Sequence, residues 1–271
     1  MTGCGFVSQP VILFITIERI NFLSKYIGWD IEVTRIDIDN WESQDPLAQI
    51  TCAALSFDDE PTKLYYNAAD EGQPMNGVQL SQMIDHMVRC VRDGYTIATW
   101  NGLKLDFKLL YLLTKNEDVR CLAANHADMM LTFMCCTGYY AALKNVEGQH
   151  GITRTGDKLG VHAYEVWEQG DYQSVLDYVI EDADNTLLLA NDIANCGQIK
   201  RLTQRGAFRA VDVPTVHTSG DQPPRLLTVK ESISLPHPDT SWMRDPGPMR
   251  SDHYDWIQDL IQPPVDEFTF N

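Results

Sequence analysis

An apolar run with two acidic residues in its second half constrains the fold of this chain more than any other feature. Tyr26 to Val33 is rich in β-branched and aromatic residues, which predicts a buried strand. Asp30 and Glu32 stand two positions apart, so on a strand their side chains project from the same face. Two carboxylates on a buried strand are costly unless something compensates their charge. A divalent cation would do so, because Mg²⁺ prefers carboxylate oxygens. A chance pair of acids at a strand edge is the alternative.

The segments that follow predict an α/β fold with a mixed sheet. The expected elements are strands over Tyr26 to Val33, Ile50 to Phe57, Lys63 to Asn67 and Tyr95 to Trp100, and helices over Val78 to Arg92, about Leu103 to Leu113, and Tyr172 to Asn195. A turn at Asp58-Asp-Glu-Pro61 joins the second and third strands, and the first three strands form an antiparallel meander. The later strand and helices add parallel strands and flanking helices. Lys144 to Gly160 is typical of a loop, and Met129 to Cys136 fits either element.

A second acidic position follows the fourth predicted strand. Asn101 is a plausible N-cap for the next helix, and Gly102 allows a tight turn from strand to helix. Asp106 falls in the first turns of that helix, where the helix dipole favours a carboxylate. The pattern therefore predicts either a third metal-binding carboxylate or a residue that only complements the dipole.

The longest predicted helix carries a tyrosine and an aspartate on one face. Tyr178 and Asp182 are four residues apart, which places them side by side on a helix. The aspartate can hold a metal ion and the phenol can orient a water molecule. A half-buried tyrosine beside an exposed acid on an amphipathic helix is the alternative for this pair alone.

Taken together, the three motifs resemble those of the DEDD superfamily of 3′→5′ exonucleases, in its tyrosine-containing branch. The matching segments are Trp29-Asp-Ile-Glu32, Asn101-Gly-Leu-Lys-Leu-Asp106 and Tyr178-Val-Ile-Glu-Asp182. The resemblance covers about residues 25–196 and is closest to the proofreading domains of DNA polymerases. It departs from the family at Leu105, where a phenylalanine is usual, and at Val33, where many members have threonine.

The resemblance implies an RNase H-like fold and a metal-dependent exonuclease that releases nucleoside 5′-monophosphates from single-stranded ends. It implies two divalent ions, Mg²⁺ or Mn²⁺, held by Asp30, Glu32 and Asp182, with Asp106 binding one ion directly or through water. Tyr178 would orient the attacking water. No histidine stands four residues before Asp182, as the histidine-containing branch requires.

Substrate contacts are expected at both ends of these motifs. The resemblance places Val33 near the substrate 3′ end, and Ile31 and Asn101 are also expected to contact substrate. Lys104 and Lys108 flank Asp106, and a basic cluster that includes Arg201 and Arg205 follows the long helix. Each of these cations either contacts phosphate or is an ordinary surface charge.

Composition limits the partners of the chain. The net charge is −17 and the sequence pI is about 4.6, the wrong sign for holding nucleic acid by bulk electrostatics. Divalent cations could offset this charge locally. Seven cysteines, an odd number with no Cys-x-x-Cys, predict reduced thiols and a cytoplasmic protein. The apolar run from Val11 to Ile17 is too short to span a membrane.

Three regions are expected. Residues 1–24 form a leader or an edge strand, residues 25–199 form the exonuclease-like domain, and residues 200–271 form a basic segment and a C-terminal extension. Nine of the 13 prolines fall in the last region, which predicts an extended tail that lies over the core or binds a protein partner. Two other functions stay open: a non-catalytic nucleic-acid-binding or scaffold module, and a nuclease for very short oligonucleotides.

Overall fold

The computed structural model describes residues 25–37, 40–44, 46–155, 159–217, 224–243 and 251–261. The predicted leader or edge strand at residues 1–24, with its apolar run, lies outside the described residues. So do most of the prolines and the last aromatic residues of the C-terminal extension.

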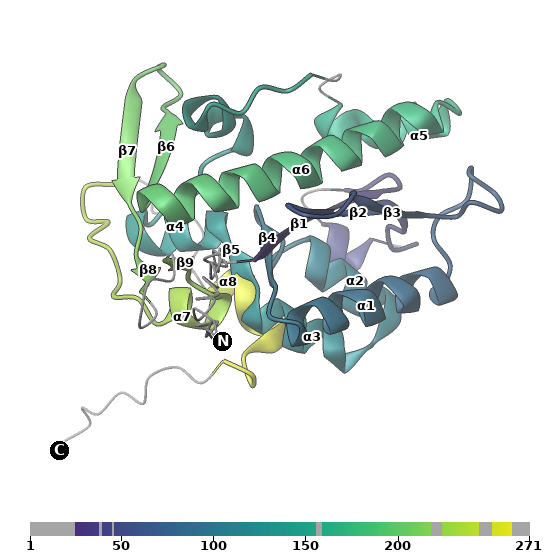
Figure 1. Cartoon of the computed structure of the whole chain (residues 1–271), viewed down its shortest axis with the longest axis horizontal. Helices are drawn as coiled ribbons and strands as arrows, with labels where there is room; N and C mark the ends of the chain where they lie inside the picture. The colour runs from purple at the N-terminus through teal and green to yellow at the C-terminus, as the bar shows by residue number, and fades with distance from the viewer. Residues whose placement is uncertain are drawn as a thin grey trace, which may run out of the picture.

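A five-stranded mixed sheet forms the centre of the fold (Figure 1). Its strands are β1 (Tyr26–Val33), β2 (Ile50–Phe57), β3 (Lys63–Tyr66), β4 (Thr96–Thr99) and β5 (Ala127–Asp128), in the order β3-β2-β1-β4-β5. The first three are antiparallel neighbours, whereas β4 and β5 continue the sheet parallel to β1. The predicted α/β fold, with a meander extended by parallel strands, is confirmed, and this strand order is consistent with the RNase H-like fold.

Helices cover both faces of the sheet (Figure 1). The elements on and around the sheet are α1 (Gly77–Arg92), α2 (Asp106–Thr114), α3 (Glu117–Asn125), α4 (Met129–Thr137), α5 (Ala163–Glu168) and α6 (Tyr172–Cys196), with 3-10 turns at Trp41–Ser43, Leu143–Asn145, Glu147–His150 and Gly160–His162. The apolar segment from Met129 to Cys136, whose sequence fits either a strand or a helix, is therefore helical. Its first backbone amides are satisfied by Asp128, whose carboxylate accepts from Leu131 N.

Alternate residues of β1 serve different faces. Ile27, Trp29 and Ile31 belong to the large core beneath α1, α2 and α3, where the Trp29 and Phe107 rings lie 4.3 Å apart. The intervening positions face α6. Strand alternation thus puts the two acidic residues of β1 on the face that the longest helix covers.

The chain after α6 is more structured than its composition predicts. It forms the hairpin β6 (Gln198–Leu202) and β7 (Phe208–Asp212), the pair β8 (Thr215–Val216) and β9 (Arg225–Leu226), helices α7 (Val229–Ile233) and α8 (Ser251–Tyr254), and a 3-10 turn at Asp255–Ile257. Val229, Ile257 and Ile261 are buried in the same core as Trp29. The described residues of this segment thus lie over the core, one of the two expected placements, but they form short strands and helices and not an extended tail, because scattered apolar side chains anchor them between the prolines.

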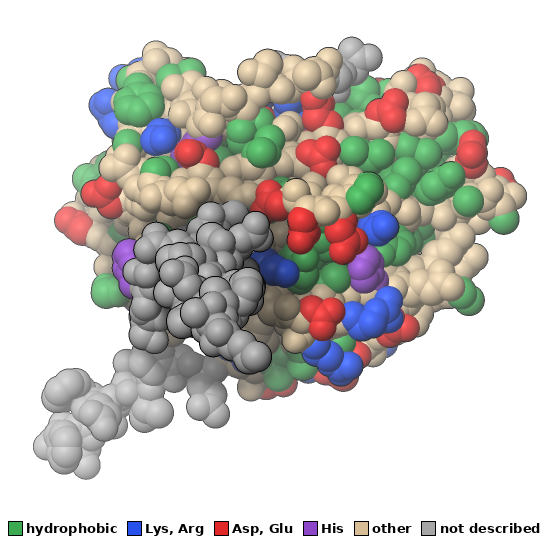
Figure 2. Space-filling view, in the orientation of Figure 1, with side chains coloured by type: hydrophobic (Ala, Val, Ile, Leu, Met, Phe, Trp, Pro, Cys, Tyr) green, Lys and Arg blue, Asp and Glu red, His purple; other side chains and the backbone are tan. Residues whose placement is uncertain are grey.

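The predicted division between residues 199 and 200 falls within β6 and stays a prediction. Among the described residues, no helix is both long enough and apolar enough to cross a membrane. Figure 2 shows acidic side chains spread over the viewed face, with only small groups of Lys and Arg between them. The cytoplasmic location and a protein partner for the C-terminal extension stay predictions.

Candidate metal centre

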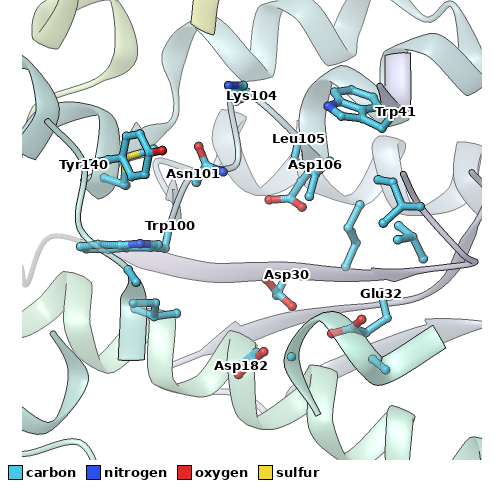
Figure 3. Close-up of a pocket in the computed structure, with 18 of the residues that line it drawn as sticks. Asp30, Glu32, Trp41, Trp100, Asn101, Lys104, Leu105, Asp106, Tyr140 and Asp182 are labelled. Atoms are coloured by element: carbon cyan, nitrogen blue, oxygen red, sulfur yellow. The ribbon is translucent and has the colours of Figure 1, made fainter. Parts of the chain in front are cut away.

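Three carboxylates from two distant segments meet on the α6 face of β1. One carboxylate oxygen each from Asp30, Glu32 and Asp182 lie within 4.8 Å of one another. Figure 3 shows Asp30 and Glu32 on the strand with Asp182 facing them from the helix. Strand periodicity puts Asp30 and Glu32 on one face of β1, and the packing of α6 against that face brings Asp182 to them.

A glycine fixes how closely α6 approaches β1. A Cβ atom on Gly28 would lie 2.0 Å from the carbonyl oxygen of Ala183 and 2.7 Å from the amide nitrogen of Leu187. Only a residue without a side chain allows this contact. Because Asp182 immediately precedes Ala183, the same contact determines the distance from Asp182 to Asp30.

Asp106 completes the acidic wall from the opposite side. It is the first residue of α2, it is 7% exposed, and it lines the same cavity as the three other carboxylates. Figure 3 shows it across the strand from Asp30. It stands outside the tight group of three, so it would reach a bound ion from a separate side.

The turn before α2 differs from the predicted cap. Asn101 is not the N-cap, because α2 begins at Asp106 after Leu105, and Asn101 has a left-handed φ of 71°. Asp128 instead binds the turn, accepting from Asn101 N and Leu103 N at 3.0 Å each. Gly102 is needed as expected, since a Cβ there would lie 2.6 Å from Thr99 Oγ1.

Tyr178 lies next to the acidic cluster on α6. Its side chain is 9% exposed and lines the cavity. Burial, followed by the negative charges of Asp182 and Glu32, raises the pKa of its hydroxyl. The phenol is therefore protonated at neutral pH and can donate a hydrogen bond, whereas it is a poor base.

The electrostatics of the cluster favour a cation. Burial raises the pKa values of Asp30 and Glu32 well above their usual range, and the charges of Asp182 and Asp106 raise them further. Burial also raises the pKa of Asp106 and Asp182. These hard oxygen donors, recessed and mutually repulsive, fit the ligand preferences of Mg²⁺ and Mn²⁺. The acidic cluster can therefore bind a divalent metal ion.

A cavity of about 560 Å³ opens over the carboxylates. Its wall includes Ile31, Val33, Asn101 and Lys104, and their contact with a substrate stays a prediction. Aromatic side chains also line it: Trp41, Trp100, Tyr140 and Tyr164. Figure 3 places Trp41 at one end of the cavity and Trp100 and Tyr140 at the other, with the acids between them.

The other expected substrate contacts lie elsewhere. Lys108 does not line the cavity; it is buried and forms ion pairs with Glu42 at 2.8 Å and Asp255 at 3.3 Å. Arg201 donates to the Tyr139 hydroxyl at 2.9 Å, and Arg205 is exposed in the turn between β6 and β7. Lys108 thus binds the C-terminal segment through Asp255. Arg201 and Arg205 belong to the β6–β7 hairpin and do not line the cavity.

Sequence reasoning missed Arg154, Glu147 and His253. The Arg154 guanidinium donates to both Asp182 and Glu147, although nothing in the local sequence marks either contact. His253 of α8 lines the cavity, is 2% exposed, and has a buried Nε2 without a hydrogen-bond partner among the described residues. Its position in a proline-rich segment gave no signal of a place in the site.

The strand order and the acidic cavity define an α/β protein with an RNase H-like sheet and a candidate metal centre. No protein-family model and no curated protein matches this sequence. Among solved structures, a match is found to the family B DNA polymerase from the hyperthermophilic archaeon Pyrobaculum calidifontis, with a TM-score of 0.44 and 16% identity. It covers 62% of this chain and 24% of the polymerase chain. The fold class follows from the strand order and directions described above.

Proposed function

We propose that this chain is a metal-dependent 3′→5′ exonuclease that hydrolyses terminal phosphodiesters of single-stranded nucleic acid. The observation that carries the proposal is the meeting of all three sequence motifs at one cavity. Asp30 and Glu32 come from a strand, Asp106 from the start of one helix, and Asp182 from the middle of another. Four carboxylates brought together from three elements are unfavourable without a cation.

Asp30, Glu32 and Asp182 would hold one divalent ion, Mg²⁺ or Mn²⁺, and Asp106 would hold or share a second. When bound, such ions neutralise phosphate charge and lower the pKa of water, which gives a nucleophile at neutral pH. The protonated hydroxyl of Tyr178 is suited to orient a water molecule by hydrogen bonding. The proposed product is a nucleoside 5′-monophosphate.

The cavity walls suit a single strand. Aromatic side chains at both ends offer surfaces on which bases can stack, and such stacking needs no particular base. Lys104 supplies a positive charge near the acids. A base-paired duplex would place its second strand against a protein of net charge −17. These features favour unpaired 3′ ends as the substrate.

A nuclease for very short oligonucleotides is a second candidate. Lys108, Arg201 and Arg205, the residues expected to follow a longer phosphate backbone, do not line the cavity. A cavity of about 560 Å³ with few cations around it suits a substrate of a few nucleotides.

The test uses 5′-labelled DNA and RNA of two and thirty nucleotides, incubated with Mg²⁺, Mn²⁺ or EDTA. The proteins are wild type, Asp30→Asn, Asp182→Asn and, as a matched control, Asp177→Asn, which changes an exposed acid on the same helix. We expect metal-dependent shortening from the 3′ end by wild type and the control only. Hydrolysis at the wild-type rate by both Asp30→Asn and Asp182→Asn would contradict the proposal. So would the absence of hydrolysis by wild type at either substrate length. The ratio of rates on the two lengths separates the two candidates.

A further inference from the structure

One arginine reaches the acidic cluster, and its position is fixed by a second acidic residue. Arg154 follows the 3-10 turn Glu147–His150. Its Nε donates to Glu147 Oε2 at 2.9 Å and its Nη2 to Glu147 Oε1 at 2.7 Å. This is the two-pronged geometry in which guanidinium binds carboxylate most tightly. The remaining arm, Nη1, donates to Asp182 Oδ1.

Glu147 holds the arginine at the edge of the site. Its side chain is 5% exposed, and both of its carboxylate oxygens accept hydrogen bonds from Arg154. The guanidinium also lies 5.7 Å from the centre of the Tyr178 ring. A buried acid that neutralises the arginine from behind leaves one N–H arm directed at the proposed metal ligand.

We infer that Arg154 is a built-in counter-ion that competes with a divalent metal ion for Asp182. This inference rests on the proposed metal site. In the structure described here, the positive charge beside Asp182 belongs to Arg154. An ion bound by Asp182 would share that carboxylate with a cation only one hydrogen bond away, and the two positive charges would repel each other. Metal affinity is therefore lower than the carboxylates alone would give.

A phosphate group relieves this competition. Phosphate oxygens are strong acceptors for guanidinium, so a phosphate in the cavity gives Nη1 a second partner while Glu147 keeps the side chain in place. Its negative charge also offsets the repulsion between Arg154 and the ion. Metal and a phosphate-bearing ligand should then bind cooperatively, each raising the affinity of the other by the same factor.

The test measures Mn²⁺ binding by calorimetry and by the electron paramagnetic resonance of free Mn²⁺, with and without a nucleoside 5′-monophosphate. The double variant Arg154→Met/Glu147→Gln removes the counter-ion of Asp182, and the change at Glu147 avoids leaving that second acid buried without its arginine. Arg120→Met is the matched control, since Arg120 pairs with Glu117 and Asp259 in another part of the structure. Far-ultraviolet circular dichroism establishes that each variant is folded, and Glu147→Gln alone provides a milder variant.

We expect the double variant to bind Mn²⁺ on the order of tenfold more tightly than wild type, and the control to bind like wild type. The monophosphate should tighten Mn²⁺ binding in wild type and have a smaller effect in the double variant. Unchanged or weaker Mn²⁺ binding in the double variant overturns the inference. Mn²⁺ binding to no protein overturns the metal site as well, whereas the expected binding pattern without hydrolysis overturns only the exonuclease.

Discussion

Gly28 and Ala183 are in direct backbone contact, so that a Cβ atom added to Gly28 would lie 2.0 Å from the Ala183 carbonyl oxygen. This contact joins the central strand to the longest helix next to the residues of the candidate metal centre. The spacing of two metal-binding elements therefore depends on a residue that contributes no side chain to the site.

Gly28→Ala should destabilise the protein, because backbone atoms and not a flexible side chain oppose the added methyl group. We expect a loss of about 2–3 kcal/mol in the free energy of unfolding, together with weaker metal binding. Gly77→Ala is the control, since a Cβ there meets nothing within 4 Å. Urea denaturation of both variants measures the difference. A wild-type midpoint for Gly28→Ala would mean that α6 can move away from the strand at little cost.

Asp30→Asn should stabilise the protein in EDTA. Burial and the neighbouring acids raise the pKa of Asp30, so the unfolded chain loses this proton at lower pH than the folded protein. Ionisation therefore reduces stability as the pH rises above about 4, the unfolded pKa, and the asparagine variant avoids this loss. We expect equal stability near pH 4 and a gain of at least ~1 kcal/mol at pH 7.

The same variant should respond less to metal. In wild type, Mg²⁺ or Mn²⁺ should raise the melting temperature, because a bound cation offsets both the desolvation of the buried acids and their mutual repulsion. Melting curves in EDTA and in Mn²⁺, at several pH values, measure both effects. An Asp30→Asn protein that is less stable than wild type in EDTA at pH 7 would show that the acids are not strained without a cation.

His253→Phe should separate binding from stability. Burial, and then the positive charge of Lys104, lowers the pKa of His253 to about 4, so the ring is neutral in the folded protein. Phenylalanine removes a buried nitrogen that has no partner among the described residues, which should leave stability at pH 7 unchanged or slightly higher. We expect His253→Phe to bind single-stranded nucleic acid more weakly than wild type, because that Nε2 can bind a ligand in the cavity. Binding is measured with Ca²⁺ in place of Mg²⁺, so that hydrolysis does not consume the ligand.

The pH dependence gives a second readout for His253. A lowered pKa means that wild type loses stability as the pH falls from 6.5 toward 4, where the unfolded chain binds the proton first. The phenylalanine variant should lack this part of the loss. His237→Phe, at an exposed position, is the control. Identical pH profiles for wild type and His253→Phe would contradict a buried neutral histidine.

Glu231→Gln should weaken the attachment of α7 at neutral pH. Hydrogen bonding to Arg225 lowers the pKa of Glu231 to about 2, and Glu231 also accepts from Thr228 N at 2.8 Å in a capping box. The stabilisation is present above the unfolded pKa near 4.5 and is lost as the pH falls toward 2. Because the group is partly exposed, we expect a loss of only about 1 kcal/mol at pH 7. Urea titrations from pH 7 to pH 3 should show the difference shrinking.

Hydrophobic periodicity predicted the bounds of strands and helices best where a long apolar pattern is buried in the core. The β1 and β2 strands have the predicted bounds, and the helices at Gly77–Arg92 and Tyr172–Cys196 differ from prediction by one residue at an end. Each of these elements presents a long apolar pattern to the core. The meeting of Asp30 and Asp182 could be anticipated only from the order of motifs in a resembling family, because no local pattern encodes it.

The features that the sequence did not predict depend on contacts between residues far apart in the chain. Arg154 could have paired with many acids, and only the fold brings Glu147 and Asp182 to it. Asn101 resembled an N-cap, but the carboxylate of Asp128 takes the amides of that turn. In the C-terminal segment, the high proline content drew attention away from a helix start signal. Thr228 and Glu231 have the spacing of a capping box, and this marks the start of α7.

Because His253 lines the cavity, the last part of the cavity wall is synthesised late. The acids, the aromatic walls and α6 all precede residue 200, whereas His253 and the Asp255 partner of Lys108 come about fifty residues later. During synthesis, the ribosome releases the sheet and its acids well before the segment that closes this wall. We therefore expect the cavity of a nascent chain to stay open on this side until the α8 segment has emerged and packed against it.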